Sequence, residues 1–209
     1  MIDKIGVHRV RHGDVTKGID DLMNGDVADI VYSDPPWGTG NVKYWHTINK
    51  RQTGDVTTGQ DYSEFLGAFF GVVKKYAKNI VFIEGGNQWL DQEITTAKSF
   101  GLNLLTTIDL KYRAGSKLLP MHLNIFYKNE RPAVTDEYLA ELKTTMGAKT
   151  ARLAIAPFAK EGGIILDPCC GMGYTAKAGV FHGMKFRGNE LNSHRLSKTK
   201  AFLEKNPGN

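Results

Sequence analysis

A run of four residues, Asp34-Pro35-Pro36-Trp37, combines a carboxylate, a stiff backbone carbonyl and a flat aromatic ring. It follows an apolar run over residues 28–32 that is typical of a buried strand. The tetrapeptide therefore lies where a strand ends, and ligands of open α/β sheets bind at that edge. Its groups suit a planar molecule that carries an exocyclic amine. The alternative is a proline-stiffened turn with an incidental tryptophan.

A second group with chemical potential is a glycine-rich loop between an apolar strand and a helix. Gly171 and Gly173 lack a Cβ atom, so the backbone can approach a ligand closely. Asp167 ends the strand before the loop, where it can accept from an amine or a hydroxyl. Glu190 ends the next strand, where an acid can hold both hydroxyls of a ribose. Because Gly171-x-Gly173-x-x-Ala176 also fits the dinucleotide pattern, the loop predicts only a ligand that carries an adenosine.

The charge of this loop distinguishes between such ligands. A dinucleotide pyrophosphate needs free backbone amides at the helix N-terminus. Here Asp167 disfavours a phosphate and Pro168 has no amide hydrogen. A cationic ligand fits better, and S-adenosylmethionine carries a sulfonium, an ammonium and an adenosine. The alternative is a tight strand-to-helix turn without a ligand.

Length and composition indicate an ordinary globular protein. The 209 residues are 41% hydrophobic and 23% charged, which predicts one domain over residues 1–209. No apolar stretch approaches the roughly 18 residues that span a bilayer, and the N-terminus lacks a signal-peptide core. Cys169 and Cys170 are adjacent, so they favour neither a disulfide framework nor a metal site. We expect a cytoplasmic protein with no membrane partner and no bound metal.

Positive charge is concentrated in two parts of the chain. The formal net charge is +5. Residues 177–205 hold seven basic residues against two acidic ones, and residues 111–131 hold five against one. This balance favours an anionic partner such as nucleic acid. The alternative is a set of solvated helix faces.

Short apolar runs alternate with helical patterns, which predicts βαβ units and a largely parallel sheet. We expect strands over residues 7–11, 29–33, 80–83, 102–112, 123–128, 164–166 and 185–189. We expect helices over residues 16–23, 61–78, 88–100, 135–145, 150–159, 176–182 and 192–204. The polar residues 38–60 are predicted to form a long loop, and a loop of this length in a compact domain is usually functional or mobile.

The two motifs together resemble the amino-methyltransferases that modify DNA at adenine N6 or cytosine N4. The pair is Asp-Pro-Pro-Trp at residues 34–37 and Asp-Pro-Cys-Cys-Gly-Met-Gly-Tyr-Thr-Ala at residues 167–176. Their order is similar to that of the circularly permuted beta group. The resemblance implies a Rossmann-like class I methyltransferase fold. This fold is an α/β three-layer sandwich on a mostly parallel seven-stranded sheet with an antiparallel hairpin strand. It also implies S-adenosylmethionine as cofactor and DNA as partner, and a homodimer is a further assembly to test.

The resemblance assigns roles to particular residues. Asp34 and the Pro35 carbonyl would accept the two N–H groups of the target amine, Pro36 would stiffen the turn, and Trp37 would stack on the base. The implied cofactor residues are Asp14, Asp167, Pro168, Cys169, Gly171, Gly173, Thr175 and Glu190. Lys149 matches the lysine of a preceding helix only loosely, because threonine replaces the usual proline after it.

The chain departs from the family in one respect. Members carry a target-recognition segment of many tens of residues, where this chain has only residues 129–147. Specificity is then short or relaxed, comes from a partner, or depends on residues 38–60. The basic residues that we expect to contact nucleic acid are Lys43, Lys50, Arg51, Lys111, Arg113 and Lys117. An exposed hairpin without a ligand is the alternative for the last three.

Other activities also have some support in the sequence. In the family an aspartate at the first motif position favours adenine, so Asp34 predicts adenine N6 over cytosine N4. Pro168-Cys169 is the dipeptide of cytosine-C5 enzymes, but its thiolate would face the cofactor, and we interpret both cysteines as small buried residues. A non-catalytic subunit and a nicotinamide-dependent dehydrogenase remain as alternatives.

Overall fold

The fold is built on one eight-stranded sheet, seen in a computed structural model that describes residues 1–52, 54 and 61–208. The strand order is β1-β2-β8-β7-β3-β4-β6-β5. The strands are β1 Ile2–Ile5, β2 His8–His12, β3 Ala28–Ser33, β4 Ala77–Gly85, β5 Asn103–Ala114, β6 Lys117–Tyr127, β7 Ile164–Asp167 and β8 Lys185–Glu190. Strands β2, β8, β7, β3 and β4 run parallel, whereas β1, β6 and β5 pair antiparallel at the two edges.

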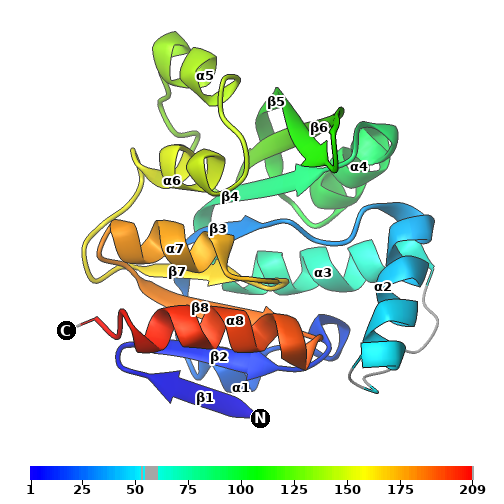
Figure 1. Cartoon of the computed structure of the whole chain (residues 1–209). Coiled ribbons are helices and arrows are strands. Elements are labelled where there is room, and N and C mark those ends of the chain that lie inside the picture. The colour runs from blue at the N-terminus through cyan, green and yellow to red at the C-terminus, as the bar shows by residue number, and fades with distance from the viewer. Residues whose placement is uncertain (53, 55–60, 209) are drawn as a thin grey trace.

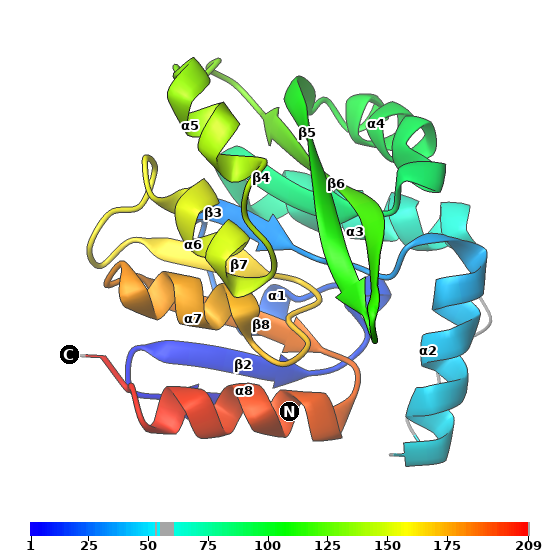
Figure 2. The ribbon, with the colours of Figure 1, turned by 45° about the horizontal axis from the view of Figure 1, so that its top comes forward.

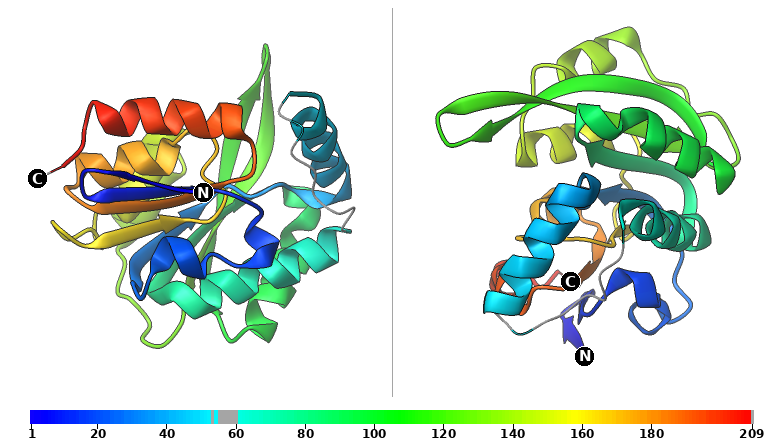
Figure 3. Two further views of the ribbon diagram at one scale, coloured as in Figure 1. Left: turned by 90° about the horizontal axis from the view of Figure 1, so that it is seen from below. Right: turned by 90° about the vertical axis from the view of Figure 1, so that its right-hand side faces the viewer.

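Helices cover both faces of this sheet. They are α1 Asp20–Met23, α2 Gly38–Gln52, α3 Tyr62–Tyr76, α4 Leu90–Ser99, α5 Asp136–Leu142, α6 Ala148–Ile155, α7 Tyr174–Phe181 and α8 Ser193–Glu204, with 3-10 turns η1 Val15–Lys17 and η2 Asn87–Trp89. In Figure 1, α6, α7 and α8 lie in front of the strands and α3 lies behind them. The left view of Figure 3 shows α7 and α8 on one side of the sheet and α1 and α3 on the other. The predicted three-layer α/β fold is confirmed.

The central strands bury both of their faces. Ile80 and Phe82 of β4 belong to the core under α6, α7 and α8, while Val81 and Ile83 belong to the core under α1, α3 and α4. This pattern is typical of parallel strands between two helical layers, where neither face meets water. The sheet is therefore a rigid base for the loops that follow β3, β7 and β8.

The predicted count of seven strands is wrong, because β1 adds an eighth. It pairs antiparallel with β2, with Ile2 opposite Arg11 at one end and Ile5 opposite His8 at the other. Gly6, with φ +55°, makes the sharp turn between them. Asp3 and Lys4 interrupt the apolar pattern of this edge strand, and the exposed side of an edge does not require apolar residues.

The predicted loop over residues 38–60 is also wrong where it can be compared. Residues 38–52 form α2, and residues 53 and 55–60 of that prediction lie outside the described residues. Polar residues dominate α2 because it packs along one narrow side and exposes the rest. It stands at the right-hand edge of Figure 1, beside the ends of the central strands.

The antiparallel hairpin is longer than predicted. The turn after β5 is confirmed at Gly115, but β6 begins at Lys117 rather than at residue 123. Pro120 has no amide hydrogen for a sheet, and it pairs with Lys111 at the free end of the hairpin, where β5 is the only described strand that β6 pairs with. Among the described helices, none is both long and apolar enough to cross a membrane.

Candidate active site

One cavity of about 270 Å³ joins the two sequence motifs. It lies at the carboxyl ends of β3, β7 and β8, where ligands bind in open α/β sheets. All four residues of the first motif line it. Of the predicted cofactor residues, Asp14, Pro168, Cys169 and Glu190 line it as well.

Parallel pairing of neighbouring strands brings the motifs together. In β3 and β7, Ile30 pairs with Ile165 and Val31 with Leu166, so both strands end at the same level. The Ser33 hydroxyl donates to Asp167 Oδ1 at 2.7 Å across this pair. Two loops that are more than 130 residues apart in sequence are thereby held side by side.

Trp37 is held in place on several sides. Its indole N–H donates to Asp34 Oδ1 at 2.9 Å. Its ring meets the Tyr112 ring edge-on, with centroids 5.1 Å apart and planes at 82°. A Cβ atom on Gly86 would lie 3.2 Å from the indole, so the ring packs against the backbone just after β4. The sequence predicted a stacking face for this residue, and the structure adds a hydrogen bond to the motif's own carboxylate.

The surroundings of Asp34 favour its protonated form. Removal from bulk water, together with the charges of Asp167 and Glu93, raises the pKa of Asp34 to about 7. The Trp37 hydrogen bond and the Arg195 charge act in the opposite direction. The Asp34 side chain is exposed at the cavity, where a ligand can reach it.

Asp167 organises the loops behind the cavity. Its Oδ1 accepts from Ser33 and from the Cys169 backbone N–H at 3.0 Å, and its Oδ2 accepts from the Thr175 hydroxyl at 2.6 Å. The side chain is buried, and burial raises its pKa to about 6. Because protein donors occupy both oxygens, Asp167 positions Pro168 and Cys169 rather than lining the cavity itself.

Glu190 is fixed by two backbone amides at the end of β8. Its Oε2 accepts from Gly171 N at 2.7 Å, and its Oε1 accepts from Asn192 N at 2.8 Å. Nearby, Asp14 Oδ1 accepts from the Thr16 amide and hydroxyl at 2.9 and 2.8 Å. Both carboxylates border the cavity in fixed orientations and keep free lone pairs for hydroxyl or amine donors.

The loop glycines leave room for α8 rather than for a ligand. A Cβ atom on Gly171 would lie 2.6 Å from Arg195 Nη2, and one on Gly173 would lie 2.9 Å from Thr199 Oγ1. Both glycines also have positive φ, at +51° and +85°. Of the predicted cofactor residues, Asp167, Gly171, Gly173 and Thr175 lie behind the described cavity wall.

Helix α2 contributes residues that the sequence did not single out as site residues. Asn41, Trp45 and Asn49 line the cavity at a spacing of four, which places them on one helix face. Trp45 packs under the Arg195 guanidinium, 4.3 Å from ring centroid to Cζ. Asn192 Nδ2 donates to Asn49 Oδ1 at 2.8 Å. The spacing of four was a usable signal, but it requires that residues 38–52 first be predicted as a helix.

Other cavity residues had weaker signals. Tyr112 lies two residues after the buried Leu110 and so on the same face of β5, where it lines the cavity. Arg195 lies three residues after the helix cap Asn192, whose side chain accepts from its amide at 2.9 Å. Arg195 is the one basic residue among the described cavity-lining residues, against Asp14, Asp34 and Glu190.

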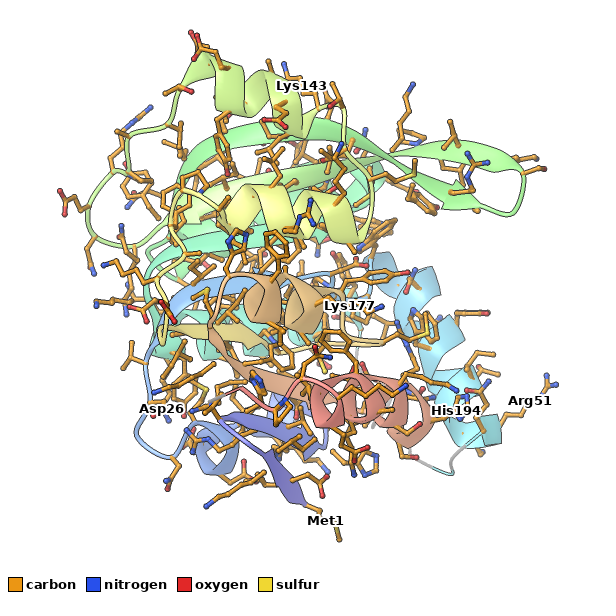
Figure 4. The ribbon with its side chains drawn as sticks, turned by 60° about the vertical axis from the view of Figure 1, so that its left-hand side comes forward. Met1, Asp26, Arg51, Lys143, Lys177 and His194 are labelled. Carbon is orange, nitrogen blue, oxygen red and sulfur yellow. The ribbon has the colours of Figure 1, made fainter. Side chains whose placement is uncertain are left out.

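The residues predicted to contact nucleic acid lie outside the cavity on both sides of it. Lys43, Lys50 and Arg51 are exposed on α2, and Lys111, Arg113 and Lys117 are exposed on the hairpin. Figure 4 shows Arg51 pointing away from the body of the molecule. Lys149, the loose family match, is exposed in the first turn of α6 and does not line the cavity.

The two cysteines differ in burial. Cys170 is buried, and Cys169 is half-buried at the cavity wall, so the prediction that both are buried holds for Cys170 alone. Burial and the charges of Asp167 and Glu190 raise the pKa of both thiols well above its usual value. A thiol that resists ionisation is a poor nucleophile.

Comparisons with known proteins give the fold. No family model and no curated protein sequence matches this chain. A candidate DNA modification methylase of Thermus thermophilus superposes with a TM-score of 0.68 and 17% identity, over 95% of each chain. M1.HpyAVI gives 0.64 and 13%, over 93% of this chain and 97% of the other. The chain has the fold of these methyltransferases.

A third solved structure is similar over most of its length. The cytosine-N4-specific PvuII DNA methyltransferase gives a TM-score of 0.63 and 13% identity, over 96% of this chain and 89% of the other. The first two proteins were also solved with S-adenosylmethionine bound. At such identities the similarity shows the fold alone.

Proposed function

We propose that this protein transfers a methyl group from S-adenosylmethionine to the N6 amine of adenine in DNA. The observation that carries the proposal is the shared cavity, in which Asp34 and Trp37 border the same space as Asp14 and Glu190. The first pair of residues alone would fit several ligands, and so would the second pair alone. Together they fit a reaction between an aromatic amine and a cationic adenosine derivative.

The cavity wall suits S-adenosylmethionine in charge and shape. Three carboxylates border it, and acidic surroundings favour a ligand with sulfonium and ammonium charges. Glu190 is oriented to accept from ribose hydroxyls, and Val15 and Leu191 offer apolar contact to an adenine ring. When bound, this cofactor supplies an electrophilic methyl group. The bound cofactor in two structures of the same fold supports the assignment.

Asp34 and Pro35 would prepare the amine for attack. An exocyclic aromatic amine is a poor nucleophile because its lone pair is delocalised into the ring. Trp37 occupies Asp34 Oδ1, which leaves Oδ2 to accept one N–H of the amine, while the Pro35 carbonyl accepts the other. These two acceptors draw the nitrogen toward tetrahedral geometry. They also stabilise the positive charge that develops on it during transfer.

Adenine is favoured over cytosine as the target base. An aspartate at the first motif position usually accompanies adenine in the family that the chain resembles. Cytosine N4 is the second candidate, because a cytosine-N4-specific enzyme has the same fold. DNA is supported as partner by the exposed basic side chains on α2 and on the hairpin, which flank the cavity mouth.

Transfer of a labelled methyl group to unmethylated DNA tests the proposal. Asp34→Ala should reduce transfer by about 10²- to 10³-fold, since it removes an acceptor aimed at developing charge. Cofactor affinity, measured by calorimetry, should change less than about twofold. Full activity of Asp34→Ala would exclude the mechanism. A wild-type protein that binds S-adenosylmethionine and DNA without turnover would indicate a non-catalytic subunit, and preferential binding of a nicotinamide dinucleotide would indicate the dehydrogenase.

A further inference from the structure

The free end of the β5–β6 hairpin, residues 111–120, projects from the body of the protein; we call it the hairpin tip. Leu110 and Met121 are the last buried pair before it. Strand β6 pairs with β4 only from Tyr127 to His122, so among the described strands only β5 and β6 make up the tip, as a two-stranded ribbon. In Figure 2 β5 and β6 run together in front of the other strands, and both views of Figure 3 show the tip extending beyond the neighbouring helices. An exposed ribbon of this kind can fit into a partner's groove.

The tip carries positive charge on both of its faces. Register places Lys111 opposite Pro120 and Arg113 opposite Leu118 on one face, and Tyr112 and Lys117 on the other. No acidic residue occurs between positions 110 and 120. The partner that fits is therefore polyanionic and reaches around the ribbon rather than along one side.

An apolar side chain is exposed at the same place. Leu118 is 50% exposed, although strand-forming leucines usually pack against a core. Leu118 pairs with Arg113, the next pair toward the turn after the Tyr112–Leu119 pair, and its side chain lies on the opposite face of the ribbon from Tyr112. Tyr112 lines the cavity and touches Trp37, so the tip is connected directly to the candidate base site.

We propose that the hairpin tip enters the major groove of duplex DNA beside the target base, an inference that rests on the proposed function. The major groove, about 12 Å wide, admits a two-stranded ribbon. Lys111, Arg113 and Lys117 contact flanking phosphates, which position the protein. Leu118 packs against the bases where the target has left the stack, since apolar side chains fill such steps. The tip thus takes the place of a separate recognition segment.

Duplex DNA is favoured over duplex RNA by the shape of the ribbon. The major groove of A-form RNA is deep and too narrow for side chains to read. A ribbon with charge on both faces therefore has no equivalent site there. Single-stranded DNA offers phosphates but no stacked step for Leu118.

Equilibrium binding to labelled oligonucleotides of one sequence tests this proposal. The probes are a DNA duplex, its single strand and the RNA duplex, with fluorescence anisotropy followed against salt and no cofactor present. Leu118→Ser should weaken duplex DNA binding roughly tenfold, because it removes the burial of one leucine. Binding of the single strand should change less than about twofold. The combined variant Lys111→Gln, Arg113→Gln, Lys117→Gln should lower the salt slope for the duplex by roughly 2 to 3.

Matched controls come from elsewhere on the surface. Val27 is also 50% exposed, and Val27→Ser should bind like the wild type. Lys4, Lys98 and Lys160 are exposed away from the tip. A variant with all three changed to glutamine should keep a steeper salt dependence of duplex binding than the tip variant. Equal unfolding midpoints establish that each variant is folded.

Several results would overturn the proposal. They are unchanged duplex binding by both tip variants, equal losses on duplex and single strand for Leu118→Ser, and equal losses on RNA and DNA duplexes. Absence of duplex binding by the wild type would also overturn it. None of these measurements uses methyl transfer. A protein that methylates DNA while its tip variants bind normally would therefore refute this inference alone, and tip-dependent binding without turnover would refute the proposed function alone.

Discussion

The indole N–H of Trp37 donates to Oδ1 of Asp34 at 2.9 Å, so the last residue of the tetrapeptide orients the first. This bond gives the aromatic residue a task besides offering a flat surface. It fixes the carboxylate rotamer and favours the ionised carboxylate. An ionised Asp34 is the form that can accept the N–H of an amine.

Trp37→Phe keeps an aromatic ring and removes the donor. In the wild type the Trp37 hydrogen bond lowers the pKa of Asp34. Without this bond, the pKa of Asp34 in the variant should rise. The acidic limb of the kcat profile should then move to higher pH, and kcat near pH 7 should fall roughly tenfold, as for a hydrogen bond to a charged group. The control is Tyr112→Phe, which keeps the edge-on contact with Trp37 and should leave the limb in place. A limb that does not move in Trp37→Phe would contradict the role of the bond.

Glu84→Gln should change how stability depends on pH. Burial and the charge of Asp34 raise the pKa of Glu84 to about 8, against the donated bond from Tyr32. The folded state therefore keeps a proton that the unfolded chain releases, and stability falls as pH rises from about 4.5 to 8. The free energy of unfolding in urea should be compared between Glu84→Gln and the wild type. Their difference should shift in favour of Glu84→Gln by at least about 1.4 kcal/mol from pH 5 to pH 8.5. The exposed control Glu204→Gln should show no such gain, and an equal gain would contradict the explanation.

Gly38→Ala should loosen the start of α2. Gly38 has φ +72°, and a Cβ atom there would lie 2.0 Å from the Trp89 ring. We expect a loss of about 1–3 kcal/mol in the free energy of unfolding. Gly40 lies two residues later, and apart from its own stretch of helix no described residue has an atom within 4 Å of its Cβ position, so Gly40→Ala should gain about 0.5–1 kcal/mol. Denaturation of both variants checks this pair, and equal effects would contradict the packing of Gly38 against Trp89.

Trp45→Ala should weaken cofactor binding. The change removes the surface under the Arg195 guanidinium and one wall of the cavity. A partly exposed cation–π contact is worth about 0.5–1 kcal/mol, so the dissociation constant should rise about two- to fivefold. Calorimetry with S-adenosylmethionine measures this directly. Thr47→Ala, on another face of α2, should bind like the wild type, and unchanged binding by Trp45→Ala would exclude Trp45 from the cofactor site.

The core of the fold was predictable because its signals are local and strong. The strands around Ile30, Ile80 and Ile165 are continuous apolar runs, and turn residues follow each of them. Strand β1 and helix α2 were missed for a common reason. Both are largely solvent-facing, so neither the twofold nor the 3.6-residue apolar period is complete in them.

The sequence was sufficient to predict which residue types form the candidate site, but not how they are arranged. The sequence indicated that Asp34 and Glu190 end strands, and the structure brings them to one cavity. It did not indicate that protein donors satisfy Asp167, or that Gly171 makes room for Arg195. These contacts join segments that are distant in the chain, and no periodic pattern encodes such pairings.

Mass analysis of the nucleosides from unmethylated DNA, incubated with the protein and S-adenosylmethionine, tests the central claim most directly. We predict N6-methyldeoxyadenosine as the methylated product, formed by the wild type and not by Asp34→Ala. N4-methyldeoxycytidine would contradict the assignment of the base. Methyl transfer to RNA alone, or no methylated nucleoside at all from a protein that binds the cofactor, would contradict the proposed function itself.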